Sequence, residues 1–450
     1  MVHHRIAFVC DFFYPRLGGV EMHQYQLAQC LMDRGHKVII ITHAYDNRSG
    51  VRYMTNGLKV YYCPLLPFVD QCCWPTMFGF FPLLRKILIR EGIEIVHAHQ
   101  ATSYLGLESM IHGKTMNYKV VYTDHSLFGF SDAACIHINK VMKFVLADID
   151  HSICVSHTNK LNLVLRANIN PYQISVIPNA VDPCRFTPDP SARFPLNTIN
   201  IVVMSRLTYR KGTDLLVDVI PPIAAMFPQT HFIIGGDGPK RQLLEEIREK
   251  HNLHGRMELL GSVPHKQVRQ VLVRGHIFLN TSLTEAFCIA IVEAASCGLK
   301  IVTTNVGGIV EVLPAHMVHL ADPEPQSIVE ALAEAIPFAK EVPSQEFHEQ
   351  VKKMYNWHEV AVRTEKVYDS LPSSNQRPAM DRINKVRSIG TWAGLMGILM
   401  VLLDLLFWLI ICWWTPEASI ERVPEFPREE YMSAKKKYGD HYFSVRQTSC

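Results

Sequence analysis

The sequence predicts an α/β protein with two doubly wound parallel sheets in tandem, a cleft between them and one membrane-spanning helix near the C-terminus. Short apolar segments alternate with amphipathic helical segments, as they do where crossover helices cover a parallel sheet. This alternation stops at a segment rich in proline and then restarts. A single long apolar run follows both halves. These observations indicate two lobes and a membrane anchor.

The first domain is expected at residues 1–183. Its intervening segments 21–34 and 81–90 have the 3.6-residue period of helices that lie on a sheet. Carboxyl ends of parallel strands face the ligand crevice in such sheets, so the loops after these strands should carry the functional residues. The strands are expected at residues 5–10, 37–42, 60–65, 93–97, 120–123 and 152–155.

A linker is expected at residues 184–198, because proline turns interrupt the pattern from residue 177 onward. The second domain should then span residues 199–370. Its strands are expected at residues 199–205, 231–235, 257–260, 276–279 and 299–303.

Composition excludes several classes of function. A formal net charge of +3 with no arginine-rich run argues against a nucleic-acid partner. Twelve cysteines without a Cys-x-x-Cys pair predict neither a zinc site nor a disulfide framework, which indicates a reducing compartment. Asp148 and Asp150 form the only suggestive Asp-x-Asp, and a solvated turn explains them better than a metal site. We therefore expect no metal and no cofactor.

The apolar run at residues 389–414 is long enough to cross the roughly 30 Å of hydrocarbon with some tilt. Trp392 and the Trp413-Trp414 pair lie where aromatic belts occur. A basic juxtamembrane segment, 371–388, precedes the run, so the positive-inside rule places the first 388 residues in the cytosol. The tail, residues 415–450, should then be luminal. Within the run, Asp404 is the single charge and suggests packing against other helices.

The acidic segment that organises the second domain contains Glu285 and Glu293. An apolar strand precedes it, and a helix-period segment follows and stops at Gly298. Glu285 should lie in the loop or first turn, where backbone N–H groups are unpaired. One glutamate could then lie beside a reacting centre while the other contacts a different part of the ligand. A capping carboxylate and a solvated helix glutamate explain the same spacing equally well.

Two loops of the first domain carry candidate binding residues. Gly18 and Gly19 follow the first strand, and adjacent glycines let backbone N–H groups approach an anion at a helix N-terminus. A plain loop fits this spacing as well. His125 directly follows another strand, where a neutral or protonated imidazole could hydrogen-bond a sugar hydroxyl. Loop histidines are also often structural.

Two turns of the second domain carry further candidates. Arg206 and Lys211 share one strand-to-helix turn, where a planar guanidinium and a compact ammonium could bind phosphate oxygens together. The alternative is a solvated basic turn. Gly236 lies in a glycine-rich turn after the next strand, which by itself is only a turn signal.

These segments together resemble the retaining glycosyltransferases with two Rossmann-like domains, the GT-B architecture, of the family 4 group. Glu285 and Glu293 match the Glu-x7-Glu motif of that family, and residues 206–212 reproduce its Arg-Leu-x-x-x-Lys-Gly pattern in full. The sequence of residues 279–298 is similar to the corresponding sequence of the A subunits of phosphatidylinositol N-acetylglucosaminyltransferase. Val310 departs from the family at a turn where proline is common.

The resemblance implies a fold, a reaction and partners. The donor would be UDP-N-acetylglucosamine and the acceptor phosphatidylinositol, in the first step of glycosylphosphatidylinositol (GPI) anchor synthesis, with retention of anomeric configuration. The chain would belong to a multi-subunit complex in the endoplasmic reticulum membrane.

The resemblance also assigns roles to residues. Gly18, Gly19, Arg206 and Lys211 would face the donor diphosphate, while Gly236 and Ile289 would lie near the nucleotide. Glu293 would bind the ribose, Glu285 would lie near the sugar or its phosphates, and His125 would touch the sugar.

Several alternatives remain open. A mannosyltransferase with a lipid-linked acceptor fits the same motifs, and so does a non-catalytic scaffold subunit that binds a nucleotide. A sugar-nucleotide epimerase has the same two-domain plan, but a membrane anchor serves no purpose for a soluble substrate. Paired carboxylates also occur in glycoside hydrolases, although hydrolysis needs no basic phosphate-binding pair. The aromatic segment 64–82 is expected either to pack as a loop or to dip into the membrane interface through Trp74, Phe78, Phe80 and Phe81.

Overall fold

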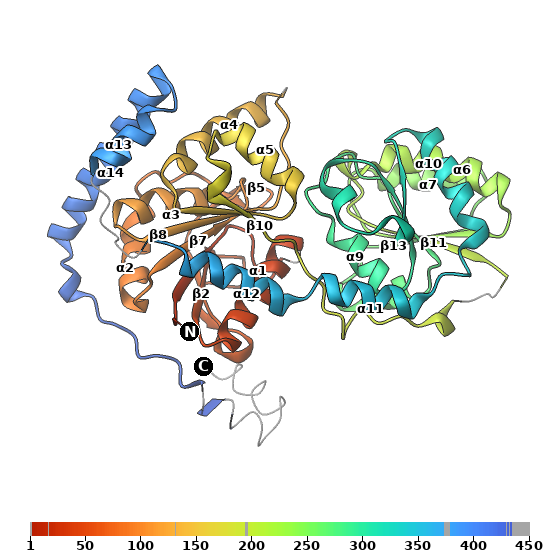
Figure 1. Ribbon diagram of the computed structural model, residues 1–450, viewed down its shortest axis with the longest axis horizontal. Helices are drawn as coiled ribbons and strands as arrows, with labels where there is room; N and C mark the ends of the chain where they lie inside the picture. Colours follow the sequence, from red (N-terminus) through yellow and green to blue (C-terminus); the bar gives the residue numbers. More distant parts are fainter. Residues whose placement is uncertain are drawn as a thin grey trace.

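The protein consists of two lobes side by side, with a long helix lying along the outer flank of the first (Figure 1). The computed structural model describes residues 2–16, 18–130, 132–193, 197–372, 379–428, 430–431 and 433. Part of the expected linker (194–196), part of the basic segment (373–378) and part of the expected tail (429, 432 and 434–450) lie outside the described residues.

The first lobe is built on an eight-stranded sheet in the order β10-β9-β8-β7-β1-β2-β4-β3. Its neighbouring strands are parallel except for the β3–β4 pair. The expected strands are all present, and β3 and β10 are additional: all four residues of β3 are exposed, so they lack the apolar pattern that marks a buried strand. The strands are β1 (Arg5–Val9), β2 (Lys37–His43), β3 (Gly50–Tyr53), β4 (Lys59–Cys63), β7 (Ile95–His99), β8 (Lys119–Asp124), β9 (His151–Cys154) and β10 (Ile174–Val176).

Crossover helices connect these parallel strands and bury the apolar side chains on the two faces of the sheet. Side-chain caps start three of these helices, because Ser103, Asp132 and Ser156 each accept a hydrogen bond from a backbone N–H of the first turn. The helices are α1 (Gly19–Asp33), α2 (Phe81–Glu91), α3 (Tyr104–Thr115), α4 (Ala133–Val145) and α5 (His157–Ala167), and a small hairpin comprises β5 (Pro67–Val69) and β6 (Cys72–Cys73).

The second lobe has a six-stranded, fully parallel sheet in the order β13-β12-β11-β14-β15-β16. The five expected strands are present, and β16 is an additional edge strand. The strands are β11 (Ile199–Met204), β12 (Thr230–Gly235), β13 (Met257–Gly261), β14 (Ile277–Asn280), β15 (Lys300–Thr304) and β16 (Val318–Ala321), and the helices are α6 (Thr213–Met226), α7 (Arg241–Lys250), α8 (His265–Leu272), α9 (Ile289–Ser296), α10 (Pro325–Ala335) and α11 (Ser344–Met354).

The chain returns to the first lobe through α12 (Trp357–Asp369), which packs against α1. Glu365 on α12 forms an ion pair with Arg34, and the Tyr368 hydroxyl lies 2.7 Å from Nδ1 of His97 on β7. Figure 1 shows this helix crossing from the second lobe to the first. Residues 357–369 were expected with the second sheet, yet their contacts are with the first.

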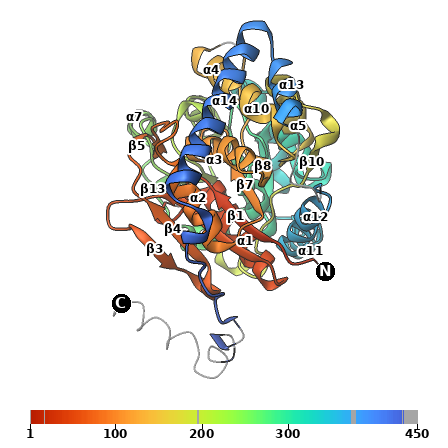
Figure 2. The same cartoon turned by 90° about the vertical axis from the view of Figure 1, so that its left-hand side faces the viewer.

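The C-terminal helices α13 (Ala379–Arg387) and α14 (Thr391–Trp414) pack against each other on the flank of the first lobe. Figure 2 shows α14 running along this flank in front of α2 and α3. By length and composition, α14 is able to cross a membrane, as predicted.

The aromatic segment 64–82, which leads into α2, exposes only some of the rings that could reach a membrane interface. The Trp74 side chain is exposed, whereas Phe80 and Phe81 are buried. The ring of Phe81 stacks on His112 of α3, so packing within the lobe, not contact with lipid, accounts for it.

Candidate active site

Two neighbouring strands of the second lobe bring the basic turn and the acidic loop together. β11 pairs in parallel with β14, so the segments that follow both strands meet at one edge of the sheet. The Thr281 hydroxyl donates to the carbonyl of Gly212 at 2.9 Å. Gly212 has φ +66°, and a Cβ there would lie only 1.7 Å from the carbonyl oxygen of Thr281. Glycine is therefore required for the two segments to approach so closely.

The ammonium of Lys211 contacts the carboxylate of Glu285 directly. The Ser282 hydroxyl donates to the same carboxylate at 2.9 Å. Burial lowers the pKa of Lys211, but the charges of Glu285 and Cys288 and the hydrogen bond to Glu285 together outweigh burial, and the pKa is raised above its ordinary value. Lys211 is therefore a cation at neutral pH, next to an acidic side chain that holds it in place.

The turn after β15 also holds the loop that carries Glu285. The backbone N–H of Gly308 donates to the carbonyl of Glu285 at 2.9 Å. Cys288 adopts a left-handed φ of +61°, which is unfavourable for a residue with a side chain. Helix α9 begins only after it, at Ile289, so Glu285 lies in the loop as predicted.

Glu293 has a different partner. It is buried on α9, and its carboxylate lies 3.1 Å from Nε2 of His265 at the start of α8. Glu285 and Glu293 therefore contact separate parts of the site, as their spacing allowed. His265 was not a candidate from the sequence, because a lone histidine at a helix start carries no recognisable pattern.

Arg206 is exposed in the same turn as Lys211. Its positive charge acts to lower the pKa of Glu21 on α1 of the first lobe. Burial raises the pKa of Glu21, and Arg16 and Arg206 oppose that increase. Gly18 is the N-cap residue of α1 and Gly19 its first residue. A Cβ on Gly18 would lie 2.5 Å from Oε2 of Glu21. The glycine turn and the basic turn thus belong to facing parts of the two lobes.

Gly236 packs directly against the backbone of the basic turn that contains Arg206 and Lys211. Its φ is +148°, and a Cβ there would lie 1.8 Å from the carbonyl oxygen of Ser205. The next residue continues the contact, since the N–H of Leu207 donates to the carbonyl of Asp237 at 2.9 Å. The glycine-rich turn therefore sets the position of the residues on either side of Arg206.

His125 lies in a buried cluster of histidines. Its Nε2 is 3.3 Å from Nδ1 of His99, and its ring centroid is 4.7 Å from that of His23. Burial lowers the pKa of His125 well below the usual value, so the imidazole is neutral at pH 7. Nitrogen atoms of His23, His99 and His125 lie within 4.8 Å of one another, a grouping that could hold a metal ion. The sequence analysis did not predict this grouping, because its members come from three separate segments.

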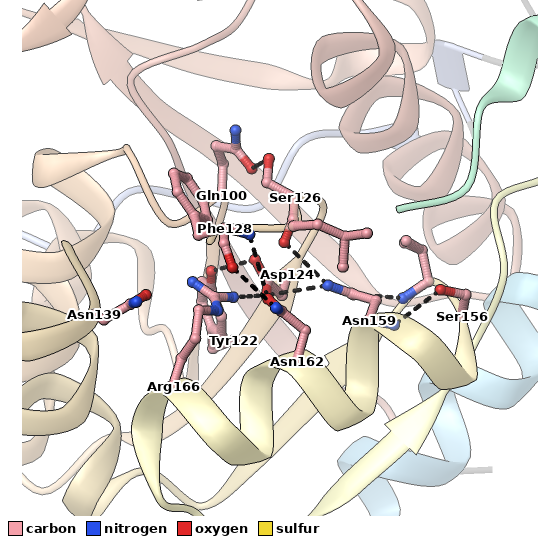
Figure 3. Close-up of polar contacts among 12 residues, drawn as sticks. Gln100, Tyr122, Asp124, Ser126, Phe128, Asn139, Ser156, Asn159, Asn162 and Arg166 are labelled. Carbon is pink, nitrogen blue, oxygen red and sulfur yellow. Dashed lines mark hydrogen bonds and ion pairs between the residues drawn. The ribbon is translucent and has the colours of Figure 1, made fainter. Parts of the chain in front are cut away.

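A polar network holds the loop that contains His125 (Figure 3). Asp124, at the end of β8, forms a fully buried ion pair with Arg166 of α5. Asn159 of α5 donates to the Asp124 carboxylate at 3.2 Å and to the Ser126 carbonyl at 3.1 Å. Asn162 donates to the Phe128 carbonyl at 3.0 Å. One helix thus holds the side chain of Asp124 before His125 and the backbone carbonyls of Ser126 and Phe128 after it.

The N-terminus of α5 also meets the second lobe. The carboxylate of Glu311 accepts hydrogen bonds from the N–H groups of His157 at 2.6 Å and Thr158 at 2.7 Å. The Ser156 hydroxyl donates to the Ala286 carbonyl, next to Glu285, at 2.7 Å. The loop of Glu285 and the helix that supports His125 are therefore in direct contact.

Comparison with known proteins is consistent with this arrangement. A family model described as PIGA (GPI anchor biosynthesis) matches residues 43–132, and one described as glycosyl transferases group 1 matches residues 188–353. The A subunit of phosphatidylinositol N-acetylglucosaminyltransferase from Arabidopsis thaliana is 54% identical, over 94% of both chains. The chain belongs to the family of these A subunits.

The corresponding protein of Homo sapiens is 52% identical over 93% of this chain and 87% of its own length. Among solved structures, Anabaena HepE in complex with UDP superposes with a TM-score of 0.65 at 18% identity, covering 82% of this chain and 100% of that one. The chain therefore has the GT-B glycosyltransferase fold predicted from the sequence, and it is a glycosyltransferase.

Proposed function

We propose that this chain transfers N-acetylglucosamine from UDP-N-acetylglucosamine to phosphatidylinositol, with retention of configuration, as the first step of GPI-anchor biosynthesis. Membership of the A-subunit family supports the reaction, and the UDP bound to a structural neighbour supports a uridine nucleotide donor. The observation that carries the assignment to residues is the contact of Lys211 with Glu285 where the basic turn meets the acidic loop.

Lys211 and Arg206 would stabilise the negative charge that develops on the leaving diphosphate. A preorganised cation is worth most where it needs no rearrangement at the moment of reaction. The N-termini of α1, at Gly18 and Gly19, and of α9, at Ile289, add unpaired backbone N–H groups.

Glu285 has two roles in this proposal. Before the donor binds, it balances the charge of Lys211. When the diphosphate takes over that cation, the carboxylate is released toward the carbohydrate, where it would accept hydrogen bonds or stabilise positive charge on the sugar ring.

His125 would act on the same sugar as a neutral hydrogen-bonding group, because burial lowers the pKa of its imidazole well below the usual value and the ring is uncharged at pH 7. Asp124, Asn159 and Arg166 would act as positioning residues for it. Glu293 would bind the ribose hydroxyls, with His265 fixing the direction of its carboxylate.

The acceptor lies in a membrane, and α14 provides a surface that could bring the chain to it. We expect both lobes to face the cytosol at the endoplasmic reticulum and further subunits to complete the complex. The sequence predicts a luminal tail, whereas Val423, Glu425 and Arg428 of this tail contact the first lobe in the structure.

The deciding experiment measures transfer by the full chain in microsomes with its partner subunits. Labelled UDP-N-acetylglucosamine and phosphatidylinositol should give a labelled glycolipid, whereas labelled GDP-mannose should not. Product from GDP-mannose alone would instead support the mannosyltransferase. Full complementation by Glu285→Ala would support a non-catalytic scaffold.

A further inference from the structure

The two lobes are joined by two chain crossings that lie side by side. Val181, in the crossing to the second lobe, forms an isolated parallel bridge with Asn356, in the crossing back. Two adjacent crossings act as one hinge, about which the lobes are able to rotate. Non-covalent contacts elsewhere on the boundary must therefore set the angle between the lobes.

Glu311, in the turn after β15 of the second lobe, has its hydrogen-bond partners in the first lobe. Its carboxylate accepts from the backbone N–H groups of His157 at 2.6 Å and Thr158 at 2.7 Å, and from the Thr158 hydroxyl at 2.5 Å. These two N–H groups start α5 and have no acceptor within the helix. The N-cap side chain, that of Ser156, accepts from the N–H of Asn159 at 3.1 Å instead. Glu311 thus completes the cap of α5 from across the boundary.

The charge and the exposure of Glu311 both suit a reversible contact. Burial raises its pKa, but the hydrogen bonds from Thr158 and His157 outweigh burial, and the pKa is lowered from its ordinary value. Glu311 is therefore a carboxylate at neutral pH, which the positive N-terminal end of α5 stabilises. The residue is exposed, so the contact can form and break without unfolding either lobe.

The same turn lies between the acidic loop and the first lobe. The N–H of Gly308 donates to the carbonyl of Glu285 at 2.9 Å. A Cβ on Gly307 would lie 2.2 Å from this carbonyl oxygen and 2.6 Å from Cδ1 of Leu127 in the first lobe. A Cβ on Gly308 would lie 2.5 Å from Oγ of Ser156. Glycine at both positions therefore lets one turn contact the acidic loop on one side and the first lobe on the other.

Helix α5 connects this contact to the loop of His125. Asn159, in the first turn of the helix, donates to the carbonyl of Ser126 at 3.1 Å. From the second lobe, Arg210 of the basic turn donates to the carbonyl of Leu127 at 3.1 Å. A movement of α5 away from the second lobe would therefore carry His125 away from the acidic loop and the basic turn together.

We propose that Glu311 is a positioning residue that sets the angle between the lobes. By capping α5 from the second lobe, it keeps His125 opposite Glu285 in the arrangement that transfer requires. Glu311 acts through α5 and the acidic loop, not on the reacting atoms. This role rests on the proposed function, in which His125 and Glu285 act on the same sugar.

Steady-state kinetics of the full chain in microsomes, with its partner subunits, test this role. Glu311→Ala removes the acceptor oxygens, and we expect kcat to fall about tenfold or more, the effect of losing charge-assisted hydrogen bonds. KM for UDP-N-acetylglucosamine should change little, because the donor-binding residues of the second lobe keep their positions. Glu311→Gln keeps one acceptor oxygen and should recover part of the rate. An unchanged kcat in Glu311→Ala, or a rise in KM alone, would overturn the proposal.

A double-mutant cycle tests whether the effect passes through α5. Thr158→Val removes the hydroxyl that donates to Glu311 and should lower kcat less than Glu311→Ala does. The double variant should be no worse than Glu311→Ala alone, because both changes act on one contact. Losses that multiply would show that Glu311 does not act through α5. Glu341→Ala, at an exposed position of the second lobe, is the control and should be fully active.

The angle between the lobes is measured directly in the purified full chain. Tyr172 on the first lobe and Lys250 on the second, both exposed, are replaced by p-acetylphenylalanine and spin-labelled, which leaves the native cysteines unchanged. Pulsed electron spin resonance should give one narrow distance distribution with Glu311 present and a broader or shifted one for Glu311→Ala. Identical distributions would overturn the proposal. This measurement needs no transfer, so a native chain that forms no labelled product counts against the proposed function alone.

Discussion

The Lys211 ammonium lies against the Glu285 carboxylate and links the turn after β11 to the loop after β14. Because the two strands are adjacent and parallel, the pair sits at one edge of the sheet, and hydrogen bonds from Ser156 to Ala286 and from Arg210 to Leu127 join this edge to the first lobe. The contact explains how a basic phosphate-binding turn and an acidic sugar-binding loop come to share one site.

Removing either charge of this pair should impair transfer. Lys211→Ala and Glu285→Gln should each lower kcat by about 100-fold or more, the range seen when one preorganised electrostatic group is lost. Transfer of labelled N-acetylglucosamine in microsomes measures the effect. Glu246→Gln, an exposed glutamate on α7, is the control and should be fully active. Normal turnover by Glu285→Gln would exclude a direct role for its charge.

Replacing Glu293 should affect donor binding more than turnover. Glu293→Gln keeps the side-chain shape but weakens a charge-assisted hydrogen bond, which is worth about 1.5–3 kcal/mol. We expect KM for the donor to rise about tenfold or more with kcat nearly unchanged. Steady-state kinetics over a range of donor concentrations separates the two parameters. A fall in kcat with constant KM would instead place this carboxylate near the reacting atoms.

The buried pair beneath His125 should be important for stability. Arg166→Met leaves the Asp124 carboxylate buried without its cation, which costs about 3–5 kcal/mol. Adding Asp124→Asn removes the unpaired charge, so the double variant should regain part of the loss. Urea unfolding in detergent measures both. Equal stability of the single and double variants would contradict this explanation.

Gly236→Ala should disturb the turn that carries Arg206. The new Cβ would meet the Ser205 carbonyl at 1.8 Å, and the backbone has a φ that disfavours side chains. We expect a loss of at least about 2 kcal/mol and a lower Tm. Gly255→Ala is the matched control, because a Cβ there would meet nothing within 4 Å. Similar melting of both variants would show that the turn tolerates displacement.

The histidine cluster should make the first lobe sensitive to acid. Burial lowers the pKa of His23 from 6.5 to about 4, so the unfolded chain binds a proton at a pH where the folded chain does not. The free energy of unfolding is therefore not reduced by His23 above pH 6.5, and it falls as the pH decreases from 6.5 toward 4. His23 alone should cost about 2 kcal/mol between pH 7.5 and pH 5.

Urea unfolding at the two pH values measures this difference. His23→Gln should reduce it, while His251→Gln, at an exposed position, should not. A pH dependence that is unchanged in His23→Gln would show that other groups cause it.

Much of this protein follows from local sequence patterns. Apolar periodicity identified the strands that form most of the two sheets, and strand-to-helix junctions made Arg206, Lys211, Glu285 and His125 candidates for the site. Strands and strand-to-helix junctions depend on residues that are close together in the sequence, so they can be predicted from the sequence. The exposed strand β3 lacked the pattern and was not predicted.

Only the tertiary structure shows which side chains contact each other. Lys211 meets Glu285, Glu293 meets His265, and Asp404 meets His112 across 292 positions of the chain. The sequence determined that residues 389–414 are apolar enough to enter a membrane, but only the folded chain showed which side of that helix is already covered. These side-chain contacts depend on packing between segments that are distant in the sequence. The local hydrophobic periodicity of the sequence therefore does not show them.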